Sequence, residues 1–188
     1  SHAPLFRSAA DGALERALAE RRVVFLPSTA DGGPLHVHEQ EAQRVAAIVQ
    51  LLARRWRLEH PDFDPGRDIG VITPFRAQAA CIYRHLPEEL QDLTVDTVER
   101  YQGGERDIII VSFAVHTPAQ MPAVMALSWN GAVDRKLNVM LTRARQQLIL
   151  LGDPNVLLNT TLADGAPAHH ARLVQELQQA GAWVEPTD

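Results

Sequence analysis

The sequence contains one cysteine, Cys81, and one lysine, Lys136. A single cysteine excludes a disulfide within the chain, which fits a reducing compartment, and we expect a cytoplasmic protein. No apolar run approaches the roughly 18 residues that a membrane-spanning helix requires, so we expect no membrane contact. The first residues show neither the basic start nor the apolar stretch of a signal peptide.

The chain also lacks an excess of positive charge. It has 18 Lys and Arg residues against 23 Asp and Glu residues, a formal net charge of −5. Proteins that bind nucleic acid mainly by neutralising phosphates carry the opposite balance. The composition therefore disfavours a histone-like protein, although it leaves room for a local basic track.

Two signatures of phosphate chemistry are missing from these 188 residues. No Gly-x-x-x-x-Gly-Lys-Ser/Thr loop occurs, so the backbone cradle and the lysine that hold nucleotide phosphates are absent. No apolar strand ends in the Asp-Glu pair that would hold Mg²⁺. We therefore expect the chain by itself to be unable to hydrolyse ATP.

Strand patterns alternate with helix patterns along the chain, and its length suits one domain. Strands are predicted at residues 22–26, 68–73, 93–97, 107–113 and 147–151, and helices at 39–59, 74–85, 134–145 and 169–180. Residues 107–113 are almost continuously apolar, as in a strand covered on both faces. This order predicts an α/β fold with a parallel sheet between helices, over residues 22–188, preceded by a poorly defined segment at 1–21.

Three segments that each join a strand to a helix or a turn carry the functional signal, because ligands of such folds collect in loops at the ends of strands. They are residues 71–78, 97–107 and 134–145. Taken singly, each has an ordinary explanation: a solvated helix start, a glycine-containing turn, and an amphipathic helix with solvated arginines. Taken in order, they form a more specific pattern.

The segments read "ITPFRAQ", "TVERYQGGERD" followed by "IIIVS", and "RKLNVMLTRAR" followed by "LILLGD". In this order they resemble motifs IV, V and VI of the superfamily 1 helicases, in the branch of the nonsense-mediated-decay and Dna-two-type enzymes. The resemblance extends over about residues 35–158. It implies a RecA-like parallel sheet between helices, of the P-loop NTPase type but without its own P-loop.

In that family, ATP lies between two RecA-like domains, and this chain resembles the second, C-terminal motor domain. The resemblance implies that Arg143 is the arginine finger and that Arg76 approaches the same γ-phosphate. A guanidinium group suits this role because it stays charged and makes paired hydrogen bonds to phosphate oxygens. ATP and Mg²⁺ are the implied cofactors, with Mg²⁺ held mainly by the other domain.

The same resemblance assigns further positions to ATP and to the nucleic acid. Gln102, Gly103 and Glu105 match positions of motif V at the nucleotide, with Glu105 toward the ribose. Thr73 and Thr97 are expected to contact the phosphate backbone of a single strand, which positions the strand without reading its sequence. Gly104 departs from the pattern, since one branch has a basic residue there, and this places that one phosphate contact in doubt.

The resemblance thus implies half of the motor of an ATP-dependent helicase or translocase. We expect DNA more than RNA as the single strand, and movement from 5′ to 3′. The implied partners are the N-terminal RecA-like domain of the same full-length protein and single-stranded DNA or RNA. The alternative is a non-catalytic RecA-like module that binds protein or a single strand, but the two phosphate-facing arginines disfavour it.

Several conspicuous residues have simpler explanations. The histidines of 36–38 and 169–170 lack companions at metal-ligand spacing, so we expect ordinary surface histidines and no metal site. Cys81 is predicted to be a packed thiol. Arg145 is expected to be structural, and Trp129 to pack beneath its loop in preference to stacking on a base.

Overall fold

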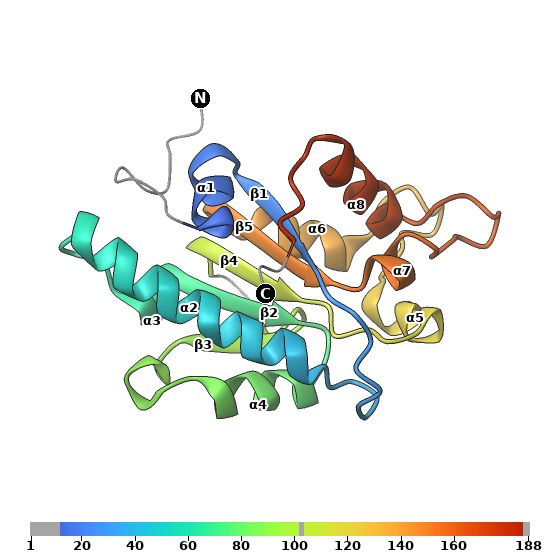
Figure 1. Ribbon diagram of the computed structural model, residues 1–188. Helices are drawn as coiled ribbons and strands as arrows, with labels where there is room; N and C mark the ends of the chain where they lie inside the picture. The colour runs from blue at the N-terminus through green and yellow to red at the C-terminus, as the bar shows by residue number, and fades with distance from the viewer. Residues whose placement is uncertain (1–11, 102–103, 186–188) are drawn as a thin grey trace.

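The computed structural model describes residues 12–101 and 104–185, and it contains one five-stranded sheet in the order β1-β5-β4-β2-β3 (Figure 1). All neighbouring strands are parallel. The strands are β1 (Val23–Pro27), β2 (Ile69–Thr73), β3 (Thr94–Thr97), β4 (Arg106–Ser112) and β5 (Ala144–Gly152). The expected RecA-like α/β fold is therefore confirmed.

Helices cover both faces of this sheet (Figure 1). One face carries α1 (Ala13–Glu20), α2 (Glu39–Glu59) and α4 (Arg76–His85); the other carries α5 (Met121–Val124), α6 (Arg135–Thr142), α7 (Pro154–Leu157) and α8 (His169–Gln179). Three single turns complete the described helices: α3 (Pro65–Asp68), η1 (Glu88–Leu90) and η2 (Pro118–Gln120). Among the described residues, no helix has both the length and the apolarity to cross a membrane.

Strand β4 explains why the sheet has two hydrophobic cores. Ile108 and Ile110 pack into the core beneath α2 and α4, whereas Ile109 and Val111 pack into the core beneath α6 and α8. All four side chains are fully buried. Because alternate residues of a strand point to opposite faces, a strand with helices on both sides must be apolar at every position. The prediction made from residues 107–113 is confirmed.

The helix of motif VI ends earlier than its sequence predicts. We expected a helix through Arg145, but α6 ends at Thr142 and β5 begins at Ala144, which pairs with Arg106 of β4. Helix-favouring residues are here overridden by pairing in the sheet, since local propensity is a weak preference that tertiary contacts outweigh. Arg145 therefore lies on a strand, and the helical prediction for it was wrong.

Two other segments are more ordered than expected. Helix α1 lies within residues 12–21 of the segment described as poorly defined, and it buries Leu18 completely in the α2 core. In the predicted loop before β2, Asp64 accepts a hydrogen bond from the Gly66 amide and starts α3 with Pro65 in its first turn. The domain limit at residue 22 stays a prediction.

Candidate functional site

Arg143 lies at the junction between α6 and β5, at the amino edge of the sheet. It caps the carboxyl end of α6 with helical backbone angles, and its carbonyl oxygen accepts a 3.0 Å hydrogen bond from the Arg106 amide. The side chain is half-buried, and its Nε is buried without a hydrogen-bond partner among the described residues. The Nε of Arg143 thus keeps a hydrogen-bonding capacity that no described residue takes up.

A groove of about 480 Å³ opens beside Arg143, between α6 and the segment that follows β3. Its lining side chains are Val98, Glu99, Tyr101, Arg135, Lys136, Val139 and Arg143. Three cationic groups face one carboxylate, and that carboxylate is engaged with the Lys136 ammonium at 2.6 Å. The groove therefore has an excess of positive charge and suits an anion.

Glu105 and Arg145 lie at the same edge of the sheet. The Arg145 guanidinium donates to the Glu105 carbonyl oxygen at 3.0 Å, and its Nε lies 3.5 Å from Asp107 Oδ1. These contacts tie the start of β5 to the start of β4, as expected of a structural arginine. The Glu105 side chain is exposed, so its carboxylate is accessible to a ligand. Gln102 and Gly103, also predicted at the nucleotide, lie outside the described residues.

Tyr101 anchors the motif V segment beneath the sheet, and the sequence alone did not predict its neighbour. A Cβ atom added to Gly70 of β2 would lie 1.7 Å from the Tyr101 hydroxyl, so only glycine leaves room for this ring. The Arg106 guanidinium stacks over the ring at 5.8 Å. Burial raises the pKa of the Tyr101 hydroxyl, and the ring acts as an apolar anchor.

The structure does not bring Arg76 and Arg143 together. Arg143 precedes the residue that pairs with Arg106, at the amino end of β4, whereas Arg76 follows β2, whose Ile72 pairs with Val111. Those two levels of β4 are about 16 Å apart at a rise of about 3.3 Å per residue. Arg76 lies beyond the farther level and is exposed in the first turn of α4.

Thr73 and Thr97 are brought together by the sheet, but they are not exposed. They are register partners at the carboxyl ends of β2 and β3. Thr73 is fully buried, and Thr97 is nearly so and interacts through its side chain with Glu99. Arg76 is therefore the accessible polar side chain of the three sequence candidates at this edge.

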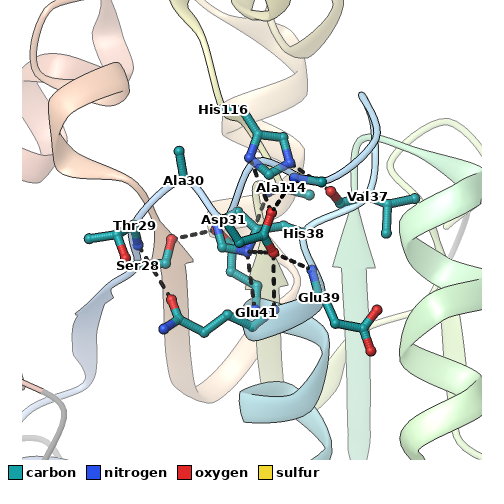
Figure 2. Close-up of polar contacts among 12 residues, drawn as sticks. Ser28, Thr29, Ala30, Asp31, Val37, His38, Glu39, Glu41, Ala114 and His116 are labelled. Atoms are coloured by element: carbon teal, nitrogen blue, oxygen red, sulfur yellow. Dashed lines mark hydrogen bonds and ion pairs between the residues drawn. The ribbon is translucent and has the colours of Figure 1, made fainter.

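A buried carboxylate joins the carboxyl ends of two strands to α2 (Figure 2). Glu41 is fully buried and accepts hydrogen bonds from the Ser28 hydroxyl at 2.6 Å, the Ser112 hydroxyl at 2.7 Å and the Ala114 amide at 2.9 Å. Ala114 has a φ of 52°, a strained value for a residue with a Cβ. Burial raises the pKa of Glu41 despite these donors.

Gln78 extends this network into the motif IV helix. Its amide oxygen accepts from the His38 backbone N–H at 2.8 Å, and its amide nitrogen donates to the His38 carbonyl and to the Ser112 hydroxyl at 3.0 Å. A glutamine at a helix start is usually solvated, but this one is fully buried. It fastens α4 to α2 and to β4, and thereby fixes the helix that carries Arg76.

Two stacked histidines cover this network on the solvent side (Figure 2). The rings of His38 and His116 lie 4.8 Å apart and nearly parallel, with Asp31 oxygens 3.6 and 3.7 Å from their Nδ1 atoms. His38 Nδ1 also accepts from the Glu41 amide and caps α2. Our prediction that His38 is a surface histidine was wrong, because the ring is fully buried as a helix cap.

His170 was likewise predicted at the surface and is fully buried. It packs edge-on against Phe113 and lies 3.7 Å from Asp134, whose other oxygen caps the start of α6. Burial lowers the pKa of His170 to about 4, against the opposing pull of the Asp134 carboxylate. The histidine is therefore neutral at physiological pH and supports the helix that leads to Arg143.

Trp129 was predicted to be packed but is exposed. We expected it to pack beneath its loop, but its side chain is 98% exposed. Its loop is closed by the pairing of Leu127 with Asp134. The indole is thus available for the base stacking that the sequence left as the alternative. Cys81, by contrast, is buried as expected.

Comparisons with known proteins identify the family of this fold. A family model described as an AAA domain matches residues 27–155, more than half of the chain. The chain is 30% identical over 156 residues to the Mus musculus protein named "Probable helicase senataxin", with 81% of this chain and 5% of senataxin covered.

Two further relatives are named as helicase/nucleases. Over 85 residues, the chain is 38% identical to the DNA replication ATP-dependent helicase/nuclease DNA2 of Homo sapiens, covering 45% of this chain and 8% of that protein. Over 122 residues, it is 36% identical to the DNA replication ATP-dependent helicase/nuclease JHS1 of Arabidopsis thaliana, covering 65% of this chain and 8% of that protein. The chain thus spans less than a tenth of the length of each relative described. With its parallel RecA-like sheet, it belongs to the AAA domain family and is a helicase-type domain of superfamily 1.

Proposed function

We propose that this chain is the second motor domain of an ATP-dependent nucleic-acid helicase and that Arg143 is its arginine finger. ATP would be held mainly by another RecA-like domain of the same full-length protein. The observation that carries the proposal is that the half-buried Arg143 side chain lines a cationic groove, while its Nε has no hydrogen-bond partner among the described residues. The accessible part of the guanidinium would donate to a γ-phosphate oxygen.

An arginine finger contributes charge neutralisation to phosphoryl transfer. Negative charge is spread over the phosphoryl oxygens in the transition state, and a cation placed in advance stabilises it without reorganisation. The backbone bond from Arg106 supports this role for Arg143, because it holds the main chain from which the side chain extends. Glu105 is our candidate for the ribose, since its carbonyl is held by Arg145 while its carboxylate is exposed. Gln102 and Gly103 keep their proposed places at the nucleotide.

The groove does not suit Mg²⁺. This ion requires carboxylate and water oxygens, whereas the groove is lined by three cations and by the Glu99 carboxylate that Lys136 occupies. We therefore propose that the other domain holds Mg²⁺. This chain alone should not turn over ATP.

We propose that the single-stranded nucleic acid binds at the carboxyl ends of the β-strands, away from Arg143 at the amino ends. Arg76 is exposed at the amino end of α4 and follows the carboxyl end of β2, the neighbour of β3, whereas Arg143 precedes the amino end of β5. We propose that Arg76 contacts the phosphate backbone of the single-stranded nucleic acid. The buried Thr73 and Thr97 would shape the surface at the carboxyl ends of β2 and β3. DNA is the preferred strand because two relatives are named for DNA replication. The 5′-to-3′ direction follows from the family resemblance alone.

The test is the single-strand-stimulated ATPase activity of the full-length gene product, measured for the wild type and for Arg143→Ala. Turnover by the wild type, its collapse in the variant and no turnover by the 188-residue chain support the proposal. Absence of turnover in the full-length product, or an unaffected variant, would favour the non-catalytic module. For Arg76→Ala, we expect a higher strand concentration for half-maximal stimulation and unchanged basal turnover.

A further inference from the structure

Three side chains of metal-binding type meet where the first turn of α2 lies against α4. Cys81 Sγ is 3.1 Å from one carboxylate oxygen of Glu39, and His85 Nε2 is 2.5 Å from the other. One ligand atom from each residue lies within 4.8 Å of the other two. Figure 2 shows the Glu39 carboxylate pointing away from the Asp31 cluster, so this group is separate from the buried network.

The backbone holds these ligands in place. Cys81 and His85 are four residues apart on α4 and therefore lie on one face, one turn above the other. Glu39 is the first residue of α2. The two helices share one hydrophobic core, in which Val45 of α2 and Ile82 of α4 are fully buried. A ligand that binds all three side chains would meet a rigid pair of helices.

We propose that Glu39, Cys81 and His85 bind a zinc ion, with a water molecule in the fourth position. Zinc accepts sulfur, nitrogen and oxygen ligands at about 2.0–2.3 Å, in tetrahedral geometry. Ligand atoms around such an ion are about 3.3–3.6 Å apart, so side-chain shifts of roughly 1 Å accommodate it. Thiolate and imidazole ligands select against Mg²⁺ and Ca²⁺, which prefer oxygen ligands alone.

Binding exchanges hydrogen bonds for coordinate bonds. Cys81 loses its thiol proton to solvent and its hydrogen bond to Glu39, and the thiolate and carboxylate together neutralise the charge of the ion. The His85 ring binds as neutral imidazole through Nε2. The Arg84 guanidinium also contacts the Cys81 sulfur and is compatible with its thiolate form.

The position of the site gives it a structural role. Zinc would join the start of α2, where His38 and Glu41 fix the carboxyl edge of the sheet, to the helix that presents Arg76. The ion would thus stiffen the edge assigned to the single strand. The proposal does not depend on that assignment, because metal binding is measured without nucleic acid or ATP.

The experiment is a titration of the reduced, metal-free 188-residue chain with Co²⁺, followed by absorption spectroscopy. Because Cys81 is the only cysteine, a thiolate-to-cobalt charge-transfer band reports this residue alone. We expect the band at one Co²⁺ per chain, with the visible bands of four-coordinate cobalt, and its loss on addition of Zn²⁺. His85→Ala and Glu39→Gln should weaken Co²⁺ binding at least 10-fold, whereas His36→Ala should bind as the wild type does.

Thermal unfolding supplies a second measurement. Zn²⁺ should raise the Tm of the wild type but not that of Cys81→Ser or His85→Ala, because a ligand stabilises the folded state that binds it. The proposal is overturned if the wild type shows no charge-transfer band. It is equally overturned if both His85→Ala and Glu39→Gln bind Co²⁺ with unchanged affinity while circular dichroism shows them folded.

Discussion

The backbone amide of Arg106 donates a 3.0 Å hydrogen bond to the carbonyl oxygen of Arg143, and this bond joins the segments that resemble motifs V and VI. Arg106 starts β4 and Ala144, which follows Arg143, starts β5. The bond therefore ties both segments to the central strands of the sheet. The backbone of Arg143 is therefore held by the core of the domain.

Replacement of Arg143 by lysine should fail to preserve activity. Lysine keeps the charge but cannot place two N–H donors in the plane that a phosphate accepts. We expect Arg143→Lys and Arg143→Ala to lower kcat of the full-length ATPase by about 10³-fold or more. Arg135→Ala, which removes an exposed cation of the same groove, is the matched control and should cost less than about 10-fold. Near wild-type turnover by Arg143→Lys would contradict the arginine-finger assignment.

The close approach of Tyr101 to Gly70 predicts that substitutions at these two positions have different effects on stability. Gly70→Ala places a methyl group into the Tyr101 ring and should destabilise the chain by about 1–3 kcal/mol, as overpacking does. Tyr101→Phe removes a buried hydroxyl that has no partner among the described residues, so it should be neutral or stabilising. Urea denaturation measures both, with Gly12→Ala, which meets no atom within 4 Å, as control. A neutral Gly70→Ala would show that the ring does not occupy this position.

Glu41 should tolerate loss of charge but not loss of its acceptors. Glu41→Ala leaves the Ala114 amide and two hydroxyls without their partner, and should cost about 2–4 kcal/mol. Glutamine can still accept from the Ala114 amide and donate to a serine hydroxyl, so Glu41→Gln should cost about 1 kcal/mol or less. The raised pKa of Glu41 also favours the neutral group, because ionisation of the buried carboxyl destabilises the fold as pH rises above the pKa of the unfolded chain. Equal losses in both variants would contradict this account.

His170 should make the domain sensitive to acid in a defined range. Its folded pKa of about 4 lies below the unfolded value of 6.5, so its contribution is complete above pH 6.5 and is lost as pH falls toward 4. The loss is about 3 kcal/mol over that range. Unfolding free energies at several pH values should show a shallower decline for His170→Gln than for the wild type or for the exposed-site control His36→Ala. Parallel declines in all three would assign the acid sensitivity to other groups.

The alternation of strands and helices was predictable because it depends on local pattern. The apolar run of β4 indicated a strand with helices on both sides, and α2 occupies the range that its apolar stripe predicted, Glu39–Glu59. The resemblance to a helicase-type domain was recognisable for the same reason, because each of the three segments that carry it is contiguous in sequence. The end of α6 was missed, since pairing of Ala144 with Arg106 depends on a segment far away in the chain.

What the sequence by itself determined is therefore the fold class and the family: a parallel α/β sheet and a helicase-type domain. Only the tertiary structure decided where the candidate side chains lie. It placed Arg76 at the carboxyl ends of the strands and Arg143 at their amino ends, and it buried His38 and His170. The physical reason is that hydrophobic periodicity reports which face of an element is covered, whereas proximity between distant segments follows from how the strands are ordered and packed.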